Sequence, residues 1–315
     1  MTSPTRQTAQ ERPAVAARSR PAAWPAALAG LLLAALQAAR PRQWPKNLLV
    51  FAAPLAGATL GRPDGFGYAL VAFAAFTAAS SAVYLINDVM DAERDRLHPA
   101  KRTRPIASGR LPKPLALALA LVGLGLAMLA SSLIREPRLA LVIGIYVLTS
   151  WLYSAGLKHV PGVELVIVAS GFVLRAIGGA VATHVPPSPW FLTICSLGAL
   201  MVAIGKRYTE LSVLGAEAAA HRPVMRWYRI WLLRAGERAV SAVMLIAYVL
   251  WALSEHDSWM RGWHLASAVP LACALIRFDG LTGLADGRPV EDLIARDPTM
   301  ICAELVWLAT FTVGL

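Results

Sequence analysis

The sequence is poor in charged residues. Only 16% of its 315 residues are Asp, Glu, Lys or Arg, whereas 57% are hydrophobic and the mean hydropathy is +0.54. A soluble domain of this size carries about a quarter charged residues, so the composition argues against a soluble globular protein. Apolar runs near the length of a bilayer-crossing helix recur along the chain, which indicates an integral membrane protein.

Cysteines and acidic residues are also scarce. The three cysteines, Cys195, Cys273 and Cys302, lie in separate apolar stretches, so neither a disulfide framework nor a cysteine-based zinc site is expected. The chain has 19 acidic against 30 basic residues, a formal net charge of +11. In a polytopic protein such an excess typically sets membrane orientation and attracts anionic lipids; the alternative is that some cations hold an anionic substrate. Because the basic residues sit in short loops between apolar runs, no nucleic-acid partner is expected.

Hydropathy predicts an all-α membrane bundle with about nine transmembrane helices. The expected spans lie near residues 47–60, 66–87, 114–134, 138–154, 161–182, 189–206, 237–254, 262–278 and 299–315. Residues 1–25, rich in Ala, Pro, Arg and Ser, are expected to form a disordered cytoplasmic tail, which leaves 26–315 as one transmembrane domain. Of the 30 Lys and Arg residues, 25 fall on one side of these spans, and the positive-inside rule places that side in the cytoplasm.

The charged stretch NDVMDAERDRLHPAKRTRP, from Asn87 to Pro105, directly follows the predicted second span. Asp88, Asp91 and Asp95 are three and four residues apart and share one face of a helix, with Asn87 at its edge. The helix dipole disfavours carboxylates at a C-terminus, so this cluster requires a cation. A ligand set made only of oxygens suits Mg²⁺, which typically bridges carboxylates to substrate phosphates. A solvated acidic loop is the alternative.

Three cations follow these carboxylates at once. Lys101, Arg102 and Arg104 are placed to hold phosphate oxygens. Carboxylates for a metal, followed by cations for phosphate, predict a single diphosphate-binding site.

The stretch NDVMDAERDRLHPAKRTRPIASG resembles the first signature of the UbiA superfamily of membrane prenyltransferases, N-D-x-x-D-x-x-x-D followed by a basic R-P-[IL]-x-x-G ending. The resemblance extends to RPRQWPKNLLVFAAPL near the start and to YSAGLKHVPGVELVIVASGFVLRAIGG in the middle. It implies a helical bundle around a central cavity in the plasma membrane. It also implies a Mg²⁺-dependent transferase whose polar site is capped by cytoplasmic loops.

One segment departs from the usual pattern of that superfamily. Members that prenylate aromatic rings carry a second aspartate-rich motif after the sixth helix, but here the segment reads GKRYTEL. Together with RPRQWPKN and GFVLRAIGG, it resembles the branch that transfers phosphoribose from 5-phosphoribosyl 1-diphosphate to a polyprenyl (decaprenyl) phosphate, a step in making cell-wall arabinan precursors. Two alternatives stay open: a prenyl-diphosphate:aromatic prenyltransferase of quinone or haem biosynthesis, and a membrane transporter without enzymatic activity.

The residues and the resemblance together give a set of candidate site residues. The metal ligands are Asn87, Asp88, Asp91 and Asp95, and the catalytic residues are Asp88, Asp91, Lys46 and Tyr153. The expected substrate contacts are Arg42, Asn47, Asn87, Lys101, Arg102, Arg104, Tyr153, Lys158, Arg175, Lys206, Arg207 and Glu210, with Glu210 orienting the cations or binding ribose hydroxyls. No general base is required, because a phosphate acceptor is already anionic.

Arg175 needs a separate interpretation because it falls inside a predicted span. It lies eleven residues after Glu164, close to three helical turns, so the two share a face of the fifth span. Ionised side chains in a span face a polar interior, so they either contact substrate or form a structural ion pair with other helices. Both readings stay open. Membrane lipids are the expected surroundings, and assembly into a homo-oligomer is compatible with the sequence.

Overall fold

The computed structural model describes residues 24–99, 101–284 and 290–315, in which every regular element is a helix. The predicted tail of residues 1–25 lies almost entirely outside the described residues. The α-helices are α1 (Trp24–Ala38), α2 (Ala52–Ala56), α3 (Pro63–Leu97), α4 (Lys113–Leu133), α5 (Pro137–Ala155), α6 (Val163–Ala182), α7 (Pro189–Leu214), α8 (Ala218–His221), α9 (Ile230–Ser254), α10 (Ser258–Gly283), α11 (Val290–Arg296) and α12 (Pro298–Val313). Four short 3₁₀ helices accompany them: η1 (Pro41–Phe51), η2 (Leu157–His159), η3 (Gly215–Glu217) and η4 (Pro223–Trp227).

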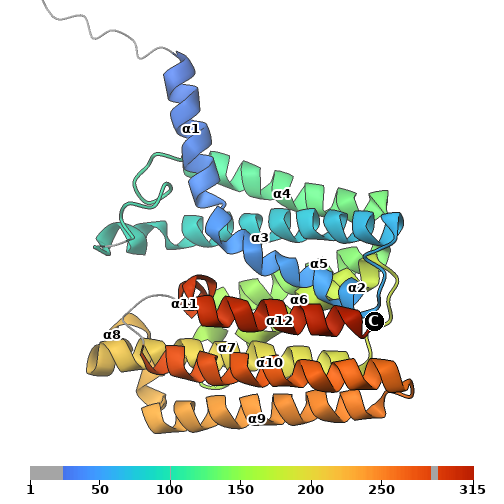
Figure 1. Cartoon of the computed structure of the whole chain (residues 1–315). Helices are drawn as coiled ribbons and strands as arrows, with labels where there is room; N and C mark the ends of the chain where they lie inside the picture. The colour runs from blue at the N-terminus through green and yellow to red at the C-terminus, as the bar shows by residue number, and fades with distance from the viewer. Residues whose placement is uncertain (1–23, 100, 285–289) are drawn as a thin grey trace, which may run out of the picture.

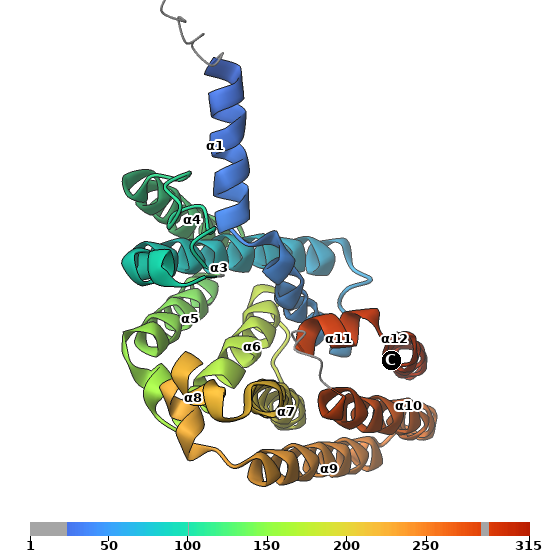
Figure 2. The same ribbon diagram turned by 90° about the vertical axis from the view of Figure 1, so that its left-hand side faces the viewer.

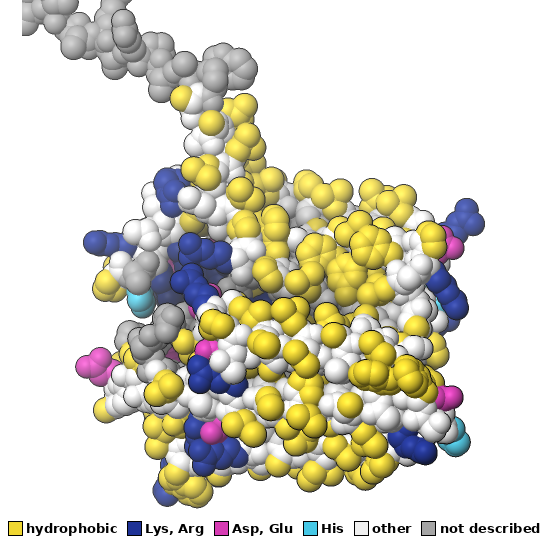
Figure 3. Space-filling model, in the orientation of Figure 1, with side chains coloured by type: hydrophobic (Ala, Val, Ile, Leu, Met, Phe, Trp, Pro, Cys, Tyr) yellow, Lys and Arg dark blue, Asp and Glu magenta, His cyan; other side chains and the backbone are white. Residues whose placement is uncertain are grey.

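Seven helices in the described part of the chain are long and apolar enough to cross a membrane, namely α3, α4, α5, α6, α7, α9 and α10. They run alongside one another with α12, and Figure 3 shows hydrophobic side chains over much of the surface and Lys and Arg gathered mainly at one end. Among the described α-helices, four begin at a proline, namely α3, α5, α7 and α12. Proline suits the first helical position because its missing N–H has no partner there. The multi-pass helical bundle expected from the sequence is therefore confirmed.

The first predicted span, residues 47–60, differs from expectation. Residues 41–56 form the 3₁₀ helix η1 followed by one turn of α-helix, α2. Pro45 lies inside η1, where its missing N–H cannot join an α-helical hydrogen-bond ladder. A 3₁₀ helix rises about 2.0 Å per residue, so η1 and α2 together extend on the order of 30 Å, close to the hydrocarbon thickness. The segment crosses the bundle in Figure 1 without being an α-helical span.

η1 packs closely on α6 because two neighbouring glycines of α6 provide the space. A Cβ added at Gly179 would overlap the carbonyl group of Val50 in η1, and one added at Gly178 would overlap the ring of Phe76 in α3. Phe76 is fully buried and meets Tyr146 of α5 edge to face, with ring centroids 5.7 Å apart. The glycine pair of the GFVLRAIGG segment therefore fixes how η1, α3, α5 and α6 come together.

Two elements stand out at one end of the bundle. α1 projects across the direction of the long helices (Figures 1 and 2) and exposes Leu28, Leu32 and Leu33, while its Ala34 and Ala38 pack against α3 and its neighbours. An apolar helix in this orientation fits the membrane interface. α11 lies at the same end, beside α12 and close to the η1 segment, as Figure 2 shows. Arg40, which follows α1, and Glu291 of α11 both line the cavity described next.

Candidate active site

A cavity of about 420 Å³ lies inside the bundle, between α3, α5, α6, α7 and η1. This volume lies within the range of ligand-binding pockets. Among the described residues, eight cations line it: Arg40, Lys46, Lys101, Arg104, Lys158, Arg175, Lys206 and Arg222. The carboxylates that line it are Asp88, Asp91 and Glu291. This excess of positive charge inside a membrane protein fits a polyanionic ligand.

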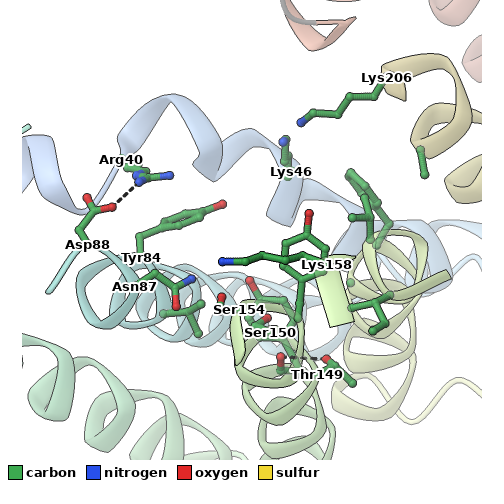
Figure 4. A pocket seen from close by; sticks show the side chains of 18 of the residues that line it. Arg40, Lys46, Tyr84, Asn87, Asp88, Thr149, Ser150, Ser154, Lys158 and Lys206 are labelled. Atoms are coloured by element: carbon green, nitrogen blue, oxygen red, sulfur yellow. Dashed lines mark hydrogen bonds and ion pairs between the residues drawn. The ribbon is translucent and has the colours of Figure 1, made fainter. Parts of the chain in front are cut away.

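The acidic end of the cavity is formed by the last turns of α3. The helix continues to Leu97, so Asp88, Asp91 and Asp95 are all helical, as their spacing predicts. Asp88 accepts hydrogen bonds from Arg40 at 2.6 Å and from Arg104 at 3.1 Å (Figure 4 shows the first of these). Asp91 lines the cavity beside Asp88. The loop that follows α3 therefore folds back and brings Arg104 onto the carboxylates that precede it.

Asp95 is placed differently from the other two aspartates. Its side chain is buried, accepts a hydrogen bond from Arg104 at 2.7 Å and is not part of the cavity lining. Among the described residues, no group of three His, Cys, Asp or Glu side chains is arranged to hold a metal by itself. Asp88, Asp91 and the amide of Asn87 remain as oxygen ligands facing the cavity. That set fits Mg²⁺, which is commonly bound by one or two carboxylates together with substrate phosphates.

The opposite end of the cavity is cationic. Lys46 of η1 and Lys206 of α7 end close together in Figure 4, and both donate to the same oxygen of Glu291 in α11, Oε1, at 2.6 and 3.3 Å. Burial raises the pKa of the Glu291 carboxyl, but the charges of Lys206 and Lys46 outweigh burial and hold that pKa at about 2. The Lys46–Glu291–Lys206 bridge thus joins three elements that are far apart in sequence.

Arg175 faces the cavity from α6 and is held by several partners. Its Nε donates to Oδ1 of Asn47 at 2.7 Å, its Nη2 donates to the Tyr146 hydroxyl at 3.0 Å, and its Nη1 donates to the Gly171 carbonyl. The sequence predicted that Asn47 contacts substrate. Asn47 is instead fully buried and does not line the cavity, and its hydrogen bond positions Arg175. Lys46 and Asn47 diverge because neighbours on a 3₁₀ helix point about 120° apart.

Arg207 and Glu210 also lie elsewhere than the sequence predicts. Arg207 is 2% exposed and donates two hydrogen bonds to the fully buried Glu164, at 2.6 and 2.7 Å, and one to Glu210 at 2.8 Å. Neither Arg207 nor Glu210 lines the cavity. The sequence left open whether Glu164 and Arg175 contact substrate or form a structural ion pair with other helices. Glu164 forms a structural ion pair with Arg207, whereas Arg175 faces the cavity.

The remaining predicted residues divide in the same way. Lys101, Tyr153 and Lys158 line the cavity, and Lys158 points toward the side where Asn87 lies (Figure 4). Arg42 and Arg102 are exposed on the surface and are not part of the lining.

Three functional candidates were missed by the sequence analysis. Arg40 lies at the junction of α1 and η1 with φ of 55°, a left-handed conformation uncommon for arginine, and its guanidinium sits 4.7 Å from the Tyr84 ring centroid. Arg222 precedes η4 and donates to the Tyr153 hydroxyl at 2.7 Å. Glu291 lies in the first turn of the short helix α11. Each lies in a connection between longer helices, where hydrophobic periodicity carries no information.

Comparison with known proteins identifies the family. The profile described as the UbiA prenyltransferase family matches residues 47–287. The chain belongs to this family. It is 42% identical over 292 residues to the decaprenyl-phosphate phosphoribosyltransferase of Mycobacterium tuberculosis, covering 90% of this chain and 94% of that protein. The enzyme of the same name from Corynebacterium glutamicum is 37% identical over 87% of this chain and 84% of its own length.

Solved structures of the UbiA family share the fold. A UbiA homologue from Archaeoglobus fulgidus, bound to GPP and Mg²⁺, aligns with a TM-score of 0.64 over 89% of this chain and 98% of the homologue. Its sequence identity is 16%, so the likeness concerns the fold alone. The UbiA-like bundle expected from the Asn87–Gly109 stretch is thus confirmed.

Proposed function

We propose that this UbiA-family chain transfers 5-phosphoribose from 5-phosphoribosyl 1-diphosphate to a polyprenyl phosphate and releases diphosphate. The observation that carries the proposal is the cationic end of the cavity, where Lys46 and Lys206 face the aspartates of α3 from across the space. A prenyl diphosphate and an aromatic ring bring one group of phosphates, whereas the phosphoribosyl donor and lipid phosphate bring three. The names of the relatives at 37–42% identity support the same assignment.

The acidic end of the cavity is suited to the leaving diphosphate. Asp88 and Asp91, with Asn87, would hold Mg²⁺ jointly with the diphosphate oxygens. The chemistry that bound Mg²⁺ supplies is neutralisation of the charge that the diphosphate gains as its bond to ribose breaks. Arg40 and Arg104 lie within hydrogen-bond distance of Asp88, so they reach the same leaving group.

The cationic end is suited to the other phosphates. Lys46 and Lys206 are point charges on flexible side chains, which suits binding of a phosphate monoester without fixed bidentate geometry. Tyr153 is held by Arg222 and can donate its hydroxyl hydrogen to a phosphate oxygen. Val83, Phe172 and Val202 give the lining an apolar part that fits the first carbons of a lipid chain.

The reaction needs no proton transfer to the protein. An oxygen of the lipid phosphate forms a bond to the anomeric carbon of ribose, and the bond from that carbon to the diphosphate oxygen breaks with its electron pair on diphosphate. Direct displacement inverts the anomeric centre. The residues therefore act by holding the phosphates in line and by stabilising negative charge.

The cavity lies toward the end of the bundle that carries the loop after α3, and Lys and Arg gather at this end in Figure 3. The positive-inside rule places this end in the cytoplasm, so we place the site at the inner face of the plasma membrane. There the water-soluble donor enters from the cytoplasm and the lipid acceptor from the bilayer.

The test uses membranes that contain the chain, ribose-labelled 5-phosphoribosyl 1-diphosphate, a polyprenyl phosphate and Mg²⁺. A labelled lipid that disappears when a chelator is added is the expected product. Membranes without the chain serve as the control. Product formed only from a prenyl diphosphate and an aromatic acid would overturn the proposal in favour of an aromatic prenyltransferase.

A further inference from the structure

Glu291 is a carboxylate in an otherwise cationic part of the cavity. It enters from α11, and its side chain is 28% exposed. The hydrogen bonds of Lys46 and Lys206 both end on Oε1, and neither lysine donates to Oε2. The carboxyl is ionised at neutral pH, because the pKa is held at about 2.

An ionised carboxylate accepts hydrogen bonds and cannot donate them. Phosphate groups of the donor and acceptor are also anionic acceptors, so Glu291 has no favourable contact to offer them. The hydroxyl groups of the ribose ring are different, because each can donate a hydrogen bond to a carboxylate oxygen. Acidic side chains serve this purpose in dinucleotide-binding folds, where one accepts from a ribose hydroxyl.

We propose that Glu291 recognises the ribose hydroxyls of the donor and thereby selects a phosphoribosyl donor over one without those hydroxyls. The proposal rests on the function proposed above and deepens it. Lys46 and Lys206 neutralise the carboxylate, so it can stand near phosphates without repelling them. The sequence assigned ribose binding or cation positioning to Glu210. Glu210 pairs with Arg207 at 2.8 Å and with the cavity-lining Arg222 at 3.4 Å, and Glu210 itself is not part of the cavity lining.

A purely structural role for Glu291 makes a different prediction. If the carboxylate only holds the two lysines, its loss lowers kcat/KM by the same factor for every donor that carries the same phosphates. If the carboxylate binds a ribose hydroxyl, its loss lowers kcat/KM only for the donors that have this hydroxyl. The two roles are therefore separated by comparing donors that differ in one hydroxyl group.

The experiment measures kcat/KM for 5-phosphoribosyl 1-diphosphate and for its 2-deoxy and 3-deoxy counterparts, with wild type and Glu291→Gln in membranes. We expect wild type to prefer the full ribose donor over at least one deoxy donor by on the order of 10- to 100-fold, the effect of one hydrogen bond to a charged acceptor. In Glu291→Gln that preference shrinks to within about 3-fold, because the neutral amide is a weaker acceptor. The change comes from slower use of the ribose donor.

Two further variants make the result decisive. Glu291→Asp keeps the negative charge near the lysines but shortens the side chain by one methylene, so we expect it to lose part of the preference for the ribose donor. This variant tests the proposal if the Glu291→Gln protein does not accumulate in membranes. Glu93→Gln is the matched control, since Glu93 is also bridged to two cations, Arg96 and Lys113, but on the surface. It keeps the wild-type preference.

The role of Glu291 would be overturned if Glu291→Gln lowered kcat/KM equally for all three donors, or if both Glu291 variants kept the wild-type preference. Either result would leave the proposed phosphoribosyl transfer intact. Wild type that makes no labelled lipid from any of the donors would instead overturn the proposed function, and this proposal with it.

Discussion

Arg207 of α7 and Glu164 of α6 form an ion pair closed by two hydrogen bonds of 2.6 and 2.7 Å, and both side chains are almost completely buried. The pair therefore acts on stability, because removing one partner leaves a buried charge without compensation. We expect Arg207→Gln to destabilise the folded chain by about 3–5 kcal/mol. The measurement is the thermal unfolding midpoint in detergent.

The double variant Glu164→Gln, Arg207→Gln is the control for this prediction. It removes both charges, so it should recover much of the lost stability. An Arg207→Gln protein with the wild-type midpoint and a raised KM for a phosphorylated substrate would contradict the structural role.

Asp91 lines the cavity, and its carboxylate is 35% exposed, so it can be changed without disturbing the core. We expect Asp91→Asn to lower kcat by on the order of 100-fold or more, because it weakens the stabilisation of the leaving diphosphate. Stability should stay within about 0.5 kcal/mol of wild type. Turnover in labelled-lipid formation and the unfolding midpoint are measured together. Full activity of Asp91→Asn would remove this residue from the site.

Gly179 lets the backbone of η1 lie directly on α6. Gly179→Ala should displace η1 and with it Lys46, because the new Cβ would overlap the Val50 carbonyl group. Overpacking of this kind costs about 1–3 kcal/mol or more. Gly125 of α4 has open space around it, so Gly125→Ala should be neutral or stabilising by up to about 1 kcal/mol. If both alanine variants show equal midpoints and activity, the close approach of η1 and α6 is refuted.

Lys206 supplies one of the two cations at the end of the cavity away from the aspartates. We expect Lys206→Gln to raise KM for the phosphorylated substrate that it binds by roughly 10-fold, the effect of losing one charge-assisted hydrogen bond. Lys113→Gln is the control, because Lys113 pairs with Glu93 on the surface. Steady-state kinetics with each substrate varied in turn shows which phosphate Lys206 holds. Unaltered KM and kcat would exclude Lys206 from binding.

The Lys46–Glu291–Lys206 bridge also predicts a pH dependence. The pKa of Glu291 falls from its ordinary value of 4.5 to about 2 in the folded chain. A depressed carboxyl pKa stabilises the fold fully above the unfolded value, and this contribution is lost as pH falls from 4.5 toward 2. Between about pH 6 and about pH 8, Glu291 stays ionised and the preference for the ribose donor should not change. A preference that disappears within this range would show that Glu291 titrates there.

The sequence predicted the helical bundle well because long apolar runs are a strong signal. α4, for example, begins and ends within one residue of the predicted span 114–134. The prediction that the first span is an α-helix was wrong. Pro45 and the contact of Val50 with Gly179 favour a 3₁₀ helix, and hydropathy cannot distinguish a 3₁₀ helix from an α-helix. Helical spacing predicted one shared face for Asp88, Asp91 and Asp95; Asp88 and Asp91 line the cavity, whereas Asp95 does not.

Contacts with other helices determine the positions of the side chains that the sequence could not predict. Lys206 and Arg207 are neighbours in one motif, yet one side chain faces the cavity and the other turns to Glu164. A motif gives the residue type but not the direction in which a helix presents it. Glu291 enters the site from a short helix 85 residues after Lys206, and nothing in its local sequence indicates that contact.

The central claim is that the phosphoribosyl group, and not the diphosphate, moves to the lipid. The most direct measurement uses two preparations of the donor, one labelled in the ribose ring and one in the β-phosphate, with a polyprenyl phosphate and membranes containing the chain. The account predicts that ribose label enters the lipid fraction while β-phosphate label stays in the aqueous phase as diphosphate. Ribose label that stays in the aqueous phase, or β-phosphate label in the lipid, would contradict it.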